Sequence, residues 1–216
     1  MTCGALACQT ATAQNSALLV KFDDGMASFI SAHNQSMLNA YPFASFENLY
    51  DLGGGDGQFI ASALAQFPNL RGTLFEQPHV AARARQRSRE AGLDRRCEVV
   101  DGDLFEAVPK GGAVYLLSRV IHDWNDELAR QILTVCRCAM GPQSVLLLVE
   151  RVLPDRMCAT AANRALAVSD LNMLVMTGGR ERTETQFKSL LESTGFSVRS
   201  VRATDTALSI IEAQPT

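Results

Sequence analysis

Five short apolar segments alternate with helix-like segments in the middle of the chain. In sequence order they are LYDL, GTLFE, CEVVDGD, AVYLLSRV and SVLLLVE, at residues 49–52, 72–76, 97–103, 113–120 and 144–150. The last segment is apolar between its first serine and its final glutamate, so both of its faces should be buried. Strands that alternate with helices in this way predict a doubly wound, mostly parallel sheet in an α/β protein.

Helical periodicity and two further apolar segments complete the predicted order of elements. Helices are predicted at residues 22–40, 57–67, 78–91, 126–139, 165–176 and 184–194. Residues 151–164 read as a loop. FSVRSV and ALSIIEA, at residues 196–201 and 207–213, read as a C-terminal antiparallel hairpin. We expect an N-terminal helical segment over residues 1–45 and one domain over residues 46–216.

A glycine-rich turn, DLGGGDG, connects the first strand to the next helix. Glycine lets a backbone adopt positive φ and approach a ligand closely. Glu76 follows at the end of the second strand, where an acidic residue typically binds ribose hydroxyls. The combination of turn and glutamate predicts a site for a nucleoside.

Two nucleoside ligands compete for this site, a nicotinamide dinucleotide and S-adenosylmethionine. A dinucleotide site uses G-x-G-x-x-G, but here Phe59 and Ile60 stand where the later glycine would fall. Asp51 precedes the turn, and Asp101 and Asp103 follow the third strand. Carboxylates repel a pyrophosphate and attract a sulfonium or an ammonium group, so the charges favour S-adenosylmethionine.

Charge and composition argue against several other classes of partner. The net charge is -3, which suggests neither a nucleic acid nor an acidic membrane as partner. No stretch approaches the ~20 apolar residues of a membrane span, and the N-terminus lacks a secretory pattern. The six cysteines form no C-x-x-C pair and read as free thiols. We therefore expect a cytoplasmic protein.

At this point the chain resembles a known family of O-methyltransferases that includes the plant caffeate and isoflavone enzymes. It is equally similar to the bacterial secondary-metabolite and acetylserotonin O-methyltransferases. The motifs in their family order are DLGGGDGQF, LFEQPHV, DGDLFEAVP, LLSRVIHDWND, LLLVERVLPD, SDLNMLVMTGGRERT and LLESTGF. The resemblance implies a class I methyltransferase fold of the Rossmann-like type, and S-adenosylmethionine bound by residues 46–216 in a catalytic domain.

The resemblance also assigns functional residues by position. Those implied to contact the cofactor, together with Asp51, are Gly53, Gly55, Glu76, Asp103, Phe105 and Ser118. Many relatives carry lysine at the position of Ser118. His122 matches the catalytic base of the family, and Glu150 and Glu181 match the acids that flank it. Apart from the resemblance, the candidates for contact with the acceptor are Met26 and Met173, since methionine adapts to flat ligands, and Asp170.

The chemistry of methyl transfer agrees with the role of His122. A phenol has a pKa near ~10 and must lose its proton to attack well at neutral pH, and histidine, with a pKa near ~6.5, can accept it. His122 and Glu150 both follow strand ends on the edge where open α/β sheets bind ligands. The Asp and Asn residues around Trp124 read as helix caps, so we expect no metal.

Family members usually carry an N-terminal domain that dimerises and covers the acceptor pocket. The chain before residue 49 is too short for that domain, so residues 1–45 read as its remnant or linker. Apolar faces on the helices at residues 22–40 and 165–176 would then be bare, which predicts a homodimer. The favoured function is transfer of a methyl group to a hydroxyl of a small, aromatic or secondary-metabolite acceptor. The alternative is an S-adenosylmethionine-binding domain that is inactive or performs non-methylating chemistry.

Overall fold

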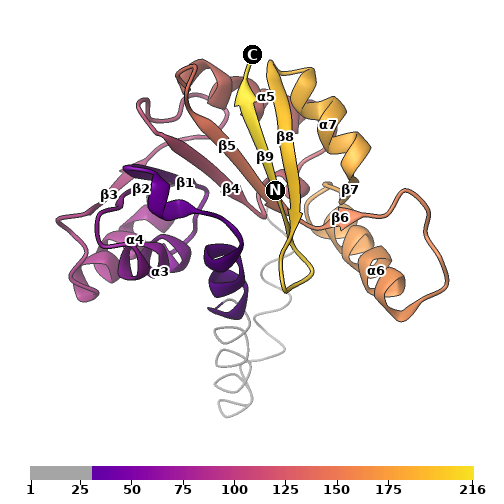
Figure 1. The fold of residues 1–216 in the computed structure, drawn as a ribbon, viewed down its shortest axis with the longest axis horizontal. Coiled ribbons are helices and arrows are strands. Elements are labelled where there is room, and N and C mark those ends of the chain that lie inside the picture. The colour runs from indigo at the N-terminus through magenta and orange to yellow at the C-terminus, as the bar shows by residue number, and fades with distance from the viewer. Residues whose placement is uncertain (1–30) are drawn as a thin grey trace, which may run out of the picture.

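The centre of the protein is a seven-stranded sheet of order β3-β2-β1-β4-β5-β9-β8 (Figure 1). The structure is a computed structural model and describes residues 31–216. Strands β1 to β5 are parallel, and β9 and β8 extend the sheet as an antiparallel hairpin. The strands are β1 Asn48–Leu52, β2 Arg71–Glu76, β3 Cys97–Asp101, β4 Val114–Ser118, β5 Val145–Glu150, β8 Phe196–Ala203 and β9 Ser209–Pro215. The predicted fold class and its C-terminal hairpin are confirmed.

Helices cover both faces of the sheet and enclose two cores. The helix at residues 31–40, α3 (Gln58–Gln66) and α4 (Pro78–Glu90) cover one face, and α5 (Asp126–Ala139) and α7 (Glu184–Glu192) cover the other. Neighbouring residues of a strand face opposite sides, so Leu116 packs in the first core and Leu117 in the second. Two short 3₁₀ turns, η1 (Phe43–Ser45) and η2 (Ile121–Asp123), complete this part.

A second, two-stranded sheet lies in the region predicted as a loop. Strand β6 (Val152–Leu153) pairs in parallel with β7 (Arg182–Thr183). Helix α6 (Ala161–Met176) starts earlier than predicted, because the Thr160 hydroxyl accepts a hydrogen bond from Asn163 N at 3.1 Å and caps it. The prediction of a loop over residues 151–164 was therefore wrong at β6 and in the first turn of α6.

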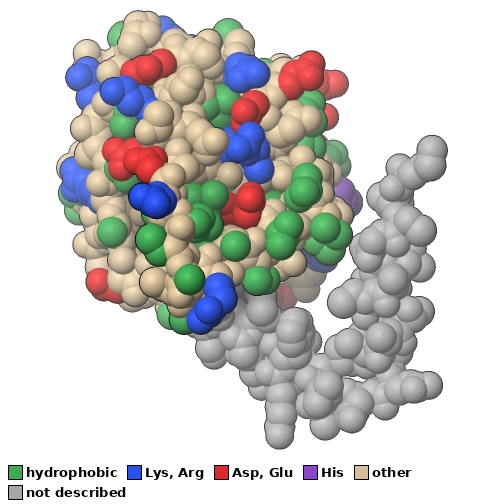
Figure 2. All heavy atoms as spheres, turned by 90° about the vertical axis from the view of Figure 1, so that its right-hand side faces the viewer, with side chains coloured by type: hydrophobic (Ala, Val, Ile, Leu, Met, Phe, Trp, Pro, Cys, Tyr) green, Lys and Arg blue, Asp and Glu red, His purple; other side chains and the backbone are tan. Residues whose placement is uncertain are grey.

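Helix α6 lies beside the small sheet, away from the main one (Figure 1), and buries none of its residues. Its exposed apolar side chains are Val168, Leu171, Leu174, Val175 and Met176. The face of the molecule seen in Figure 2 carries apolar side chains gathered over its lower part. No helix among residues 31–216 is nevertheless long and apolar enough to cross a membrane.

The helix at residues 31–40 packs onto the domain rather than standing apart from it. Met37 is 1% exposed and joins a core cluster with Leu38 and Phe43. Met37 belongs to the helix predicted over residues 22–40, whose apolar face was expected to be bare. For Met37 this expectation was wrong, because the side chain packs into the core beside the sheet. Met26 lies outside the described residues. The domain boundary near residue 45 stays a prediction.

Candidate active site

A cavity of about 420 Å³ opens at the carboxyl ends of β1, β4 and β5. This is the edge at which open α/β sheets bind ligands. Six of the predicted site residues line it: Asp51, Gly53, Gly55, Ser118, His122 and Met173. The other lining residues are Asn34, Gly54, Asp56, Gln58, Phe59, Arg119 and Arg151. The structure thus brings together the predicted cofactor loop and the predicted base.

The glycine-rich loop requires its glycines for two reasons. Gly53, Gly55 and Gly57 have φ of 70°, 62° and 83°, a region that side chains disfavour. A Cβ on Gly54 would lie 2.3 Å from Asp51 Oδ2, so the loop backbone passes directly over that carboxylate. The loop therefore exposes bare backbone to the cavity while it covers Asp51.

Asp51 is a buried carboxylate without a hydrogen-bond partner. The residue is 1% exposed, and neither carboxylate oxygen has a partner among the described residues. Burial, with the nearby charge of Glu76, raises the pKa of Asp51 to about 7. An unpaired buried acid on a cavity wall fits a cationic ligand, which would satisfy both its charge and its hydrogen bonds. The residues present therefore fit the ammonium or sulfonium group of S-adenosylmethionine.

Three other predicted cofactor residues lie outside the lining of this cavity. Glu76 accepts hydrogen bonds from Gly55 N at 3.1 Å and from Gln77 N at 2.8 Å. Asp103 Oδ1 accepts from Phe105 N at 2.8 Å. The ring of Phe105 packs edge-on against Trp124, with centroids 4.9 Å apart. Glu76 and Asp103 thus order loops at this edge of the sheet, and cofactor contact by Glu76, Asp103 and Phe105 stays a prediction.

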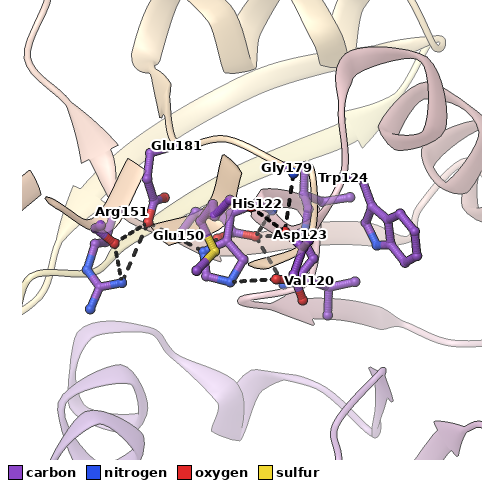
Figure 3. A network of polar contacts seen from close by, with 12 residues as sticks. Val120, His122, Asp123, Trp124, Glu150, Arg151, Gly179 and Glu181 are labelled. Atoms are coloured by element: carbon purple, nitrogen blue, oxygen red, sulfur yellow. Dashed lines mark hydrogen bonds and ion pairs between the residues drawn. The ribbon is translucent and has the colours of Figure 1, made fainter. Parts of the chain in front are cut away.

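His122 lies in η2, shortly after β4, beside two buried glutamates (Figure 3). Its Nδ1 is 3.5 Å from Glu150 Oε2 and 3.5 Å from Glu181 Oε1. Its Nε2 is 3.7 Å from Asp123 Oδ1. Because Nδ1 faces the glutamates and His122 lines the cavity, Nε2 is the atom available to a ligand.

The electrostatics of this trio favour a protonated imidazole beside an ionised Glu181. Burial alone would lower the pKa of His122, but the contact with Glu181 and the charges of Glu150, Glu181 and Asp123 raise it above 6.5. Burial would raise the pKa of Glu181, yet His122, Ser169 and Arg151 lower it overall. Burial raises the pKa of Glu150 to about 7. Glu181 is therefore the main charged partner of the imidazole.

Glu150 also holds the turn that carries His122. Its Oε1 accepts hydrogen bonds from the backbone N of Val120, Ile121 and His122 at 3.2, 2.8 and 3.3 Å. The side chain is fully buried, so these donors find no water to replace it. Glu150 thus places both the backbone and the ring of the histidine.

A second set of contacts orients Glu181. Ser169 Oγ donates to Glu181 Oε1 at 2.7 Å, and Arg151 Nη1 lies 3.6 Å from the same oxygen. Asp170 Oδ1 accepts from Glu181 N at 2.8 Å. Asp170 was predicted to contact the acceptor, and the structure places it behind Glu181 and outside the cavity lining. Contact with the acceptor stays a prediction for Asp170.

Sequence reasoning missed Arg182, whose side chain is 1% exposed. Its guanidinium donates to Ile121 O at 3.1 Å, to Trp124 O at 2.8 Å and to Asp126 Oδ1 at 2.8 Å. Beside it, a Cβ on Gly179 would lie 2.1 Å from His122 O, which demands glycine there. Arg182 and Gly179 both belong to the GGRERT motif, so this motif was the sequence signal that could have found them. No local pattern indicates which segment of the chain they contact.

His122, Glu150 and Glu181 are also a set of candidate metal ligands. One ligand atom from each of His122, Glu150 and Glu181 lies within 4.8 Å of the others. Two carboxylates and an imidazole are ligands for several divalent metals. The sequence predicted a site without a metal, and a chemical test must decide whether that prediction is right.

The fold and the cavity define a Rossmann-like methyltransferase domain, with a glycine loop on one side and a histidine held by carboxylates on the other. The family model described as the O-methyltransferase domain matches residues 2–197, and the chain belongs to this family. A phenazine O-methyltransferase of Lysobacter antibioticus is 40% identical over 194 residues, which cover 90% of this chain and 56% of that relative.

Solved structures agree with the family. The mitomycin 7-O-methyltransferase superimposes with a TM-score of 0.83 at 37% identity, over 90% of this chain and 56% of that one. An O-methyltransferase from neocarzinostatin biosynthesis, solved with S-adenosylmethionine and 2-hydroxy-5-methyl naphthoic acid, gives 0.80 at 31% identity, over 92% and 58%. The chain thus spans a little over half the length of these relatives.

Proposed function

We propose that this chain transfers the methyl group of S-adenosylmethionine to a hydroxyl of a small aromatic or secondary-metabolite acceptor. One observation carries the proposal. A buried histidine held by two carboxylates and an unpaired buried aspartate line the same cavity. The first suits deprotonation of a hydroxyl, and the second suits binding of a cation.

In this proposal His122, Glu181 and Glu150 each have a separate role. S-adenosylmethionine, when bound, supplies an activated methyl group on a sulfonium. His122 Nε2 takes the hydroxyl proton as the acceptor oxygen forms its bond to the methyl carbon and the carbon–sulfur bond breaks. Glu181 offsets the positive charge that the imidazole gains, and Glu150 keeps the ring in place. A general base in this position contributes roughly 10²–10⁴-fold.

Mass spectrometry tests the proposal directly. The chain, incubated with S-adenosylmethionine and a panel of phenols, should yield acceptors that are heavier by one methyl group. The alternative function, a domain that binds the cofactor without methylating, predicts binding of S-adenosylhomocysteine with no methylated product from any acceptor.

Cofactor affinity should depend on pH through Asp51. The free Asp51 holds its proton below about pH 7, and pairing with the ammonium group of the ligand needs the ionised form. Affinity for S-adenosylhomocysteine, measured by calorimetry, should therefore be full above pH 7 and fall by about tenfold or more towards pH 5.5. The Asp51→Asn variant should bind weakly and without this dependence.

Two further variants sharpen this test. Glu76→Ala should weaken binding by roughly 1–3 kcal/mol, through loss of hydrogen bonds that order the loop and contact the ligand. His79→Ala, on the exposed side of α4, should bind as the parent chain does. A pH dependence that survives in Asp51→Asn, or tight binding of NADH in place of S-adenosylhomocysteine, would contradict the cofactor assignment.

Activity should not require a metal. The histidine takes the proton by itself, so treatment with EDTA should leave turnover unchanged within about twofold. Loss of turnover with EDTA, and its recovery with one divalent ion, would show instead that His122, Glu150 and Glu181 hold a catalytic metal.

The exposed face of α6 should make the chain self-associate as a dimer of two copies. The apolar residues Leu171, Leu174 and Val175 are 59%, 61% and 80% exposed, and a bare face of this kind is rare on a monomer. Light scattering at micromolar concentration should report twice the chain mass, and the Leu174→Glu variant should have the mass of a single chain. Gln131→Glu, on the exposed side of α5, is the control. A clean monomer of the parent chain contradicts the prediction. The predicted cytoplasmic location stays a prediction.

A further inference from the structure

Helix α6 exposes apolar side chains to solvent, yet its other side carries two polar residues that reach Glu181. Ser169 Oγ donates a hydrogen bond to Glu181 Oε1 at 2.7 Å, and Asp170 Oδ1 accepts one from Glu181 N at 2.8 Å. Both residues are partly buried, in a helix that has no fully buried residue. The helix thus contacts one acid of the histidine site through specific polar groups.

Arg151 sets the direction of the Ser169 hydroxyl. A hydroxyl has one proton to donate and oxygen lone pairs with which it accepts. Arg151 Nη1 donates to Ser169 Oγ at 3.0 Å, so the hydroxyl proton is left for Glu181 Oε1. Figure 3 shows Arg151 and Glu181 on the same side of His122, away from Asp123. A chain of polar contacts therefore runs from Arg151 through Ser169 and Glu181 to the imidazole.

The hydroxyl of Ser169 fixes the orientation of the Glu181 carboxylate. Rotation about the last side-chain bond of a glutamate is broad, so contacts must select its orientation. Among the described residues, Oε1 faces the Ser169 hydroxyl at 2.7 Å, His122 Nδ1 at 3.5 Å and Arg151 Nη1 at 3.6 Å. The other oxygen, Oε2, is buried and has no hydrogen-bond partner among these residues. The short hydrogen bond from Ser169 therefore holds the oxygen that faces the histidine.

Ser169 reaches the site from behind, without touching a ligand. It is not among the residues that line the cavity, whereas His122 is. A hydroxyl on a helix commonly bonds to a carbonyl one turn earlier in the same helix, as Thr134 does to Arg130 O at 2.7 Å. Ser169 instead donates to a buried acid on another segment. This difference points to a role for the hydroxyl in holding that acid.

We propose that Ser169 is a positioning residue for His122. Its hydroxyl, directed by Arg151, holds Oε1 of Glu181 against Nδ1 of the imidazole. The carboxylate held in this way stabilises the imidazolium that forms when Nε2 takes the proton of the acceptor hydroxyl. The proton passes from the acceptor oxygen to Nε2, and Ser169 keeps its own. This inference rests on the proposed function, because it concerns the base of the same reaction.

Steady-state kinetics of three variants test the proposal. Ser169→Ala should lower kcat by about tenfold or more, because a hydrogen bond to a charged group is lost, and should leave the KM of the acceptor unchanged within about twofold. Ser169→Thr keeps a hydroxyl and should recover kcat to within about threefold of the parent chain. Thr134→Ala, which removes a hydroxyl bonded to its own helix, should turn over as the parent chain does. Equal kcat in the parent chain and Ser169→Ala overturns the inference.

A double-mutant cycle with Glu181→Gln shows whether Ser169 acts through the acid. If it does, the two losses of kcat overlap, and the double variant should be as slow as the slower single variant within about twofold. If the two losses multiply instead, Ser169 acts on catalysis by another route, and the inference is overturned.

NMR gives a readout that does not need turnover. The chain has three histidines, so the imidazole signals of His122 can be identified by their absence in His122→Ala. The Nδ1 proton should give a downfield signal, because Nδ1 faces the carboxylates of Glu150 and Glu181. Ser169→Ala should move this signal, and Ser169→Thr should leave it in place. A signal that does not move in Ser169→Ala overturns the inference. Absence of methylation by the parent chain, with the signal moved as expected, overturns the proposed function alone.

Cofactor binding provides the control for folding. Alanine favours a helix at least as well as serine does, so α6 should remain formed in Ser169→Ala. The affinity for S-adenosylhomocysteine, measured by calorimetry, should therefore match that of the parent chain within about twofold. A loss of kcat in Ser169→Ala that Ser169→Thr does not recover would assign the effect to the packing of α6 and contradict the proposal.

Discussion

Replacing His122 with alanine should lower turnover by at least ~10²-fold and leave the affinity for S-adenosylhomocysteine nearly unchanged. The imidazole presents Nε2 to the acceptor, because Nδ1 faces Glu150 and Glu181, and the acids beside it raise its pKa. Steady-state rates on any accepted phenol, with calorimetry of the cofactor product, check both parts. A variant that keeps full turnover would exclude His122 as the base.

The pH profile provides the control for this prediction. His122 must be neutral to accept a proton, and its pKa is raised, so turnover should increase with pH through a value above 6.5. Glu181→Gln removes a charge that raises this pKa. The acidic limb of the profile should then move to lower pH while the maximum rate falls. A limb that stays in place would show that Glu181 does not act through the imidazole.

Replacing Arg182 with methionine should destabilise the fold by about 2–4 kcal/mol, the cost of leaving one buried and one partly buried carbonyl without their donor. Those carbonyls belong to Ile121 and Trp124, on either side of His122. Because Arg182 then no longer holds the turn that carries His122, turnover should fall by more than the loss of stability explains. Denaturant unfolding and rates measured well below the midpoint check the two effects.

Arg180 provides the matched control. It also pairs with Asp126, at 3.7 Å, but both side chains are nearly half exposed. An ion pair this exposed contributes little, so Arg180→Met should cost less than about 1 kcal/mol. Equal losses for the two arginine variants would show that Arg182 acts through Asp126 rather than through the carbonyls beside the histidine.

Several features follow from neighbouring residues alone. The alternation of apolar and helical segments predicted the order of strands from residue 49 to residue 150, and apolar runs after residue 195 predicted the hairpin of β8 and β9. DLGGGDG predicted a loop of positive φ, which the structure has at Gly53 and Gly55. These patterns are local because hydrophobic period, turn and cap each depend on residues a few positions apart.

The resemblance implied that Glu150 and Glu181 flank His122, but the contacts that hold the histidine come from the tertiary structure. Glu150 and Glu181 come from distant segments, and the pairing of β6 with β7 helps to bring the second beside the first. No local pattern predicted that Arg182 would bind backbone carbonyls on either side of His122, or that Met37 would pack into the core. Such contacts arise because burial leaves polar groups with no water, so each must find its partner wherever the packed elements place one.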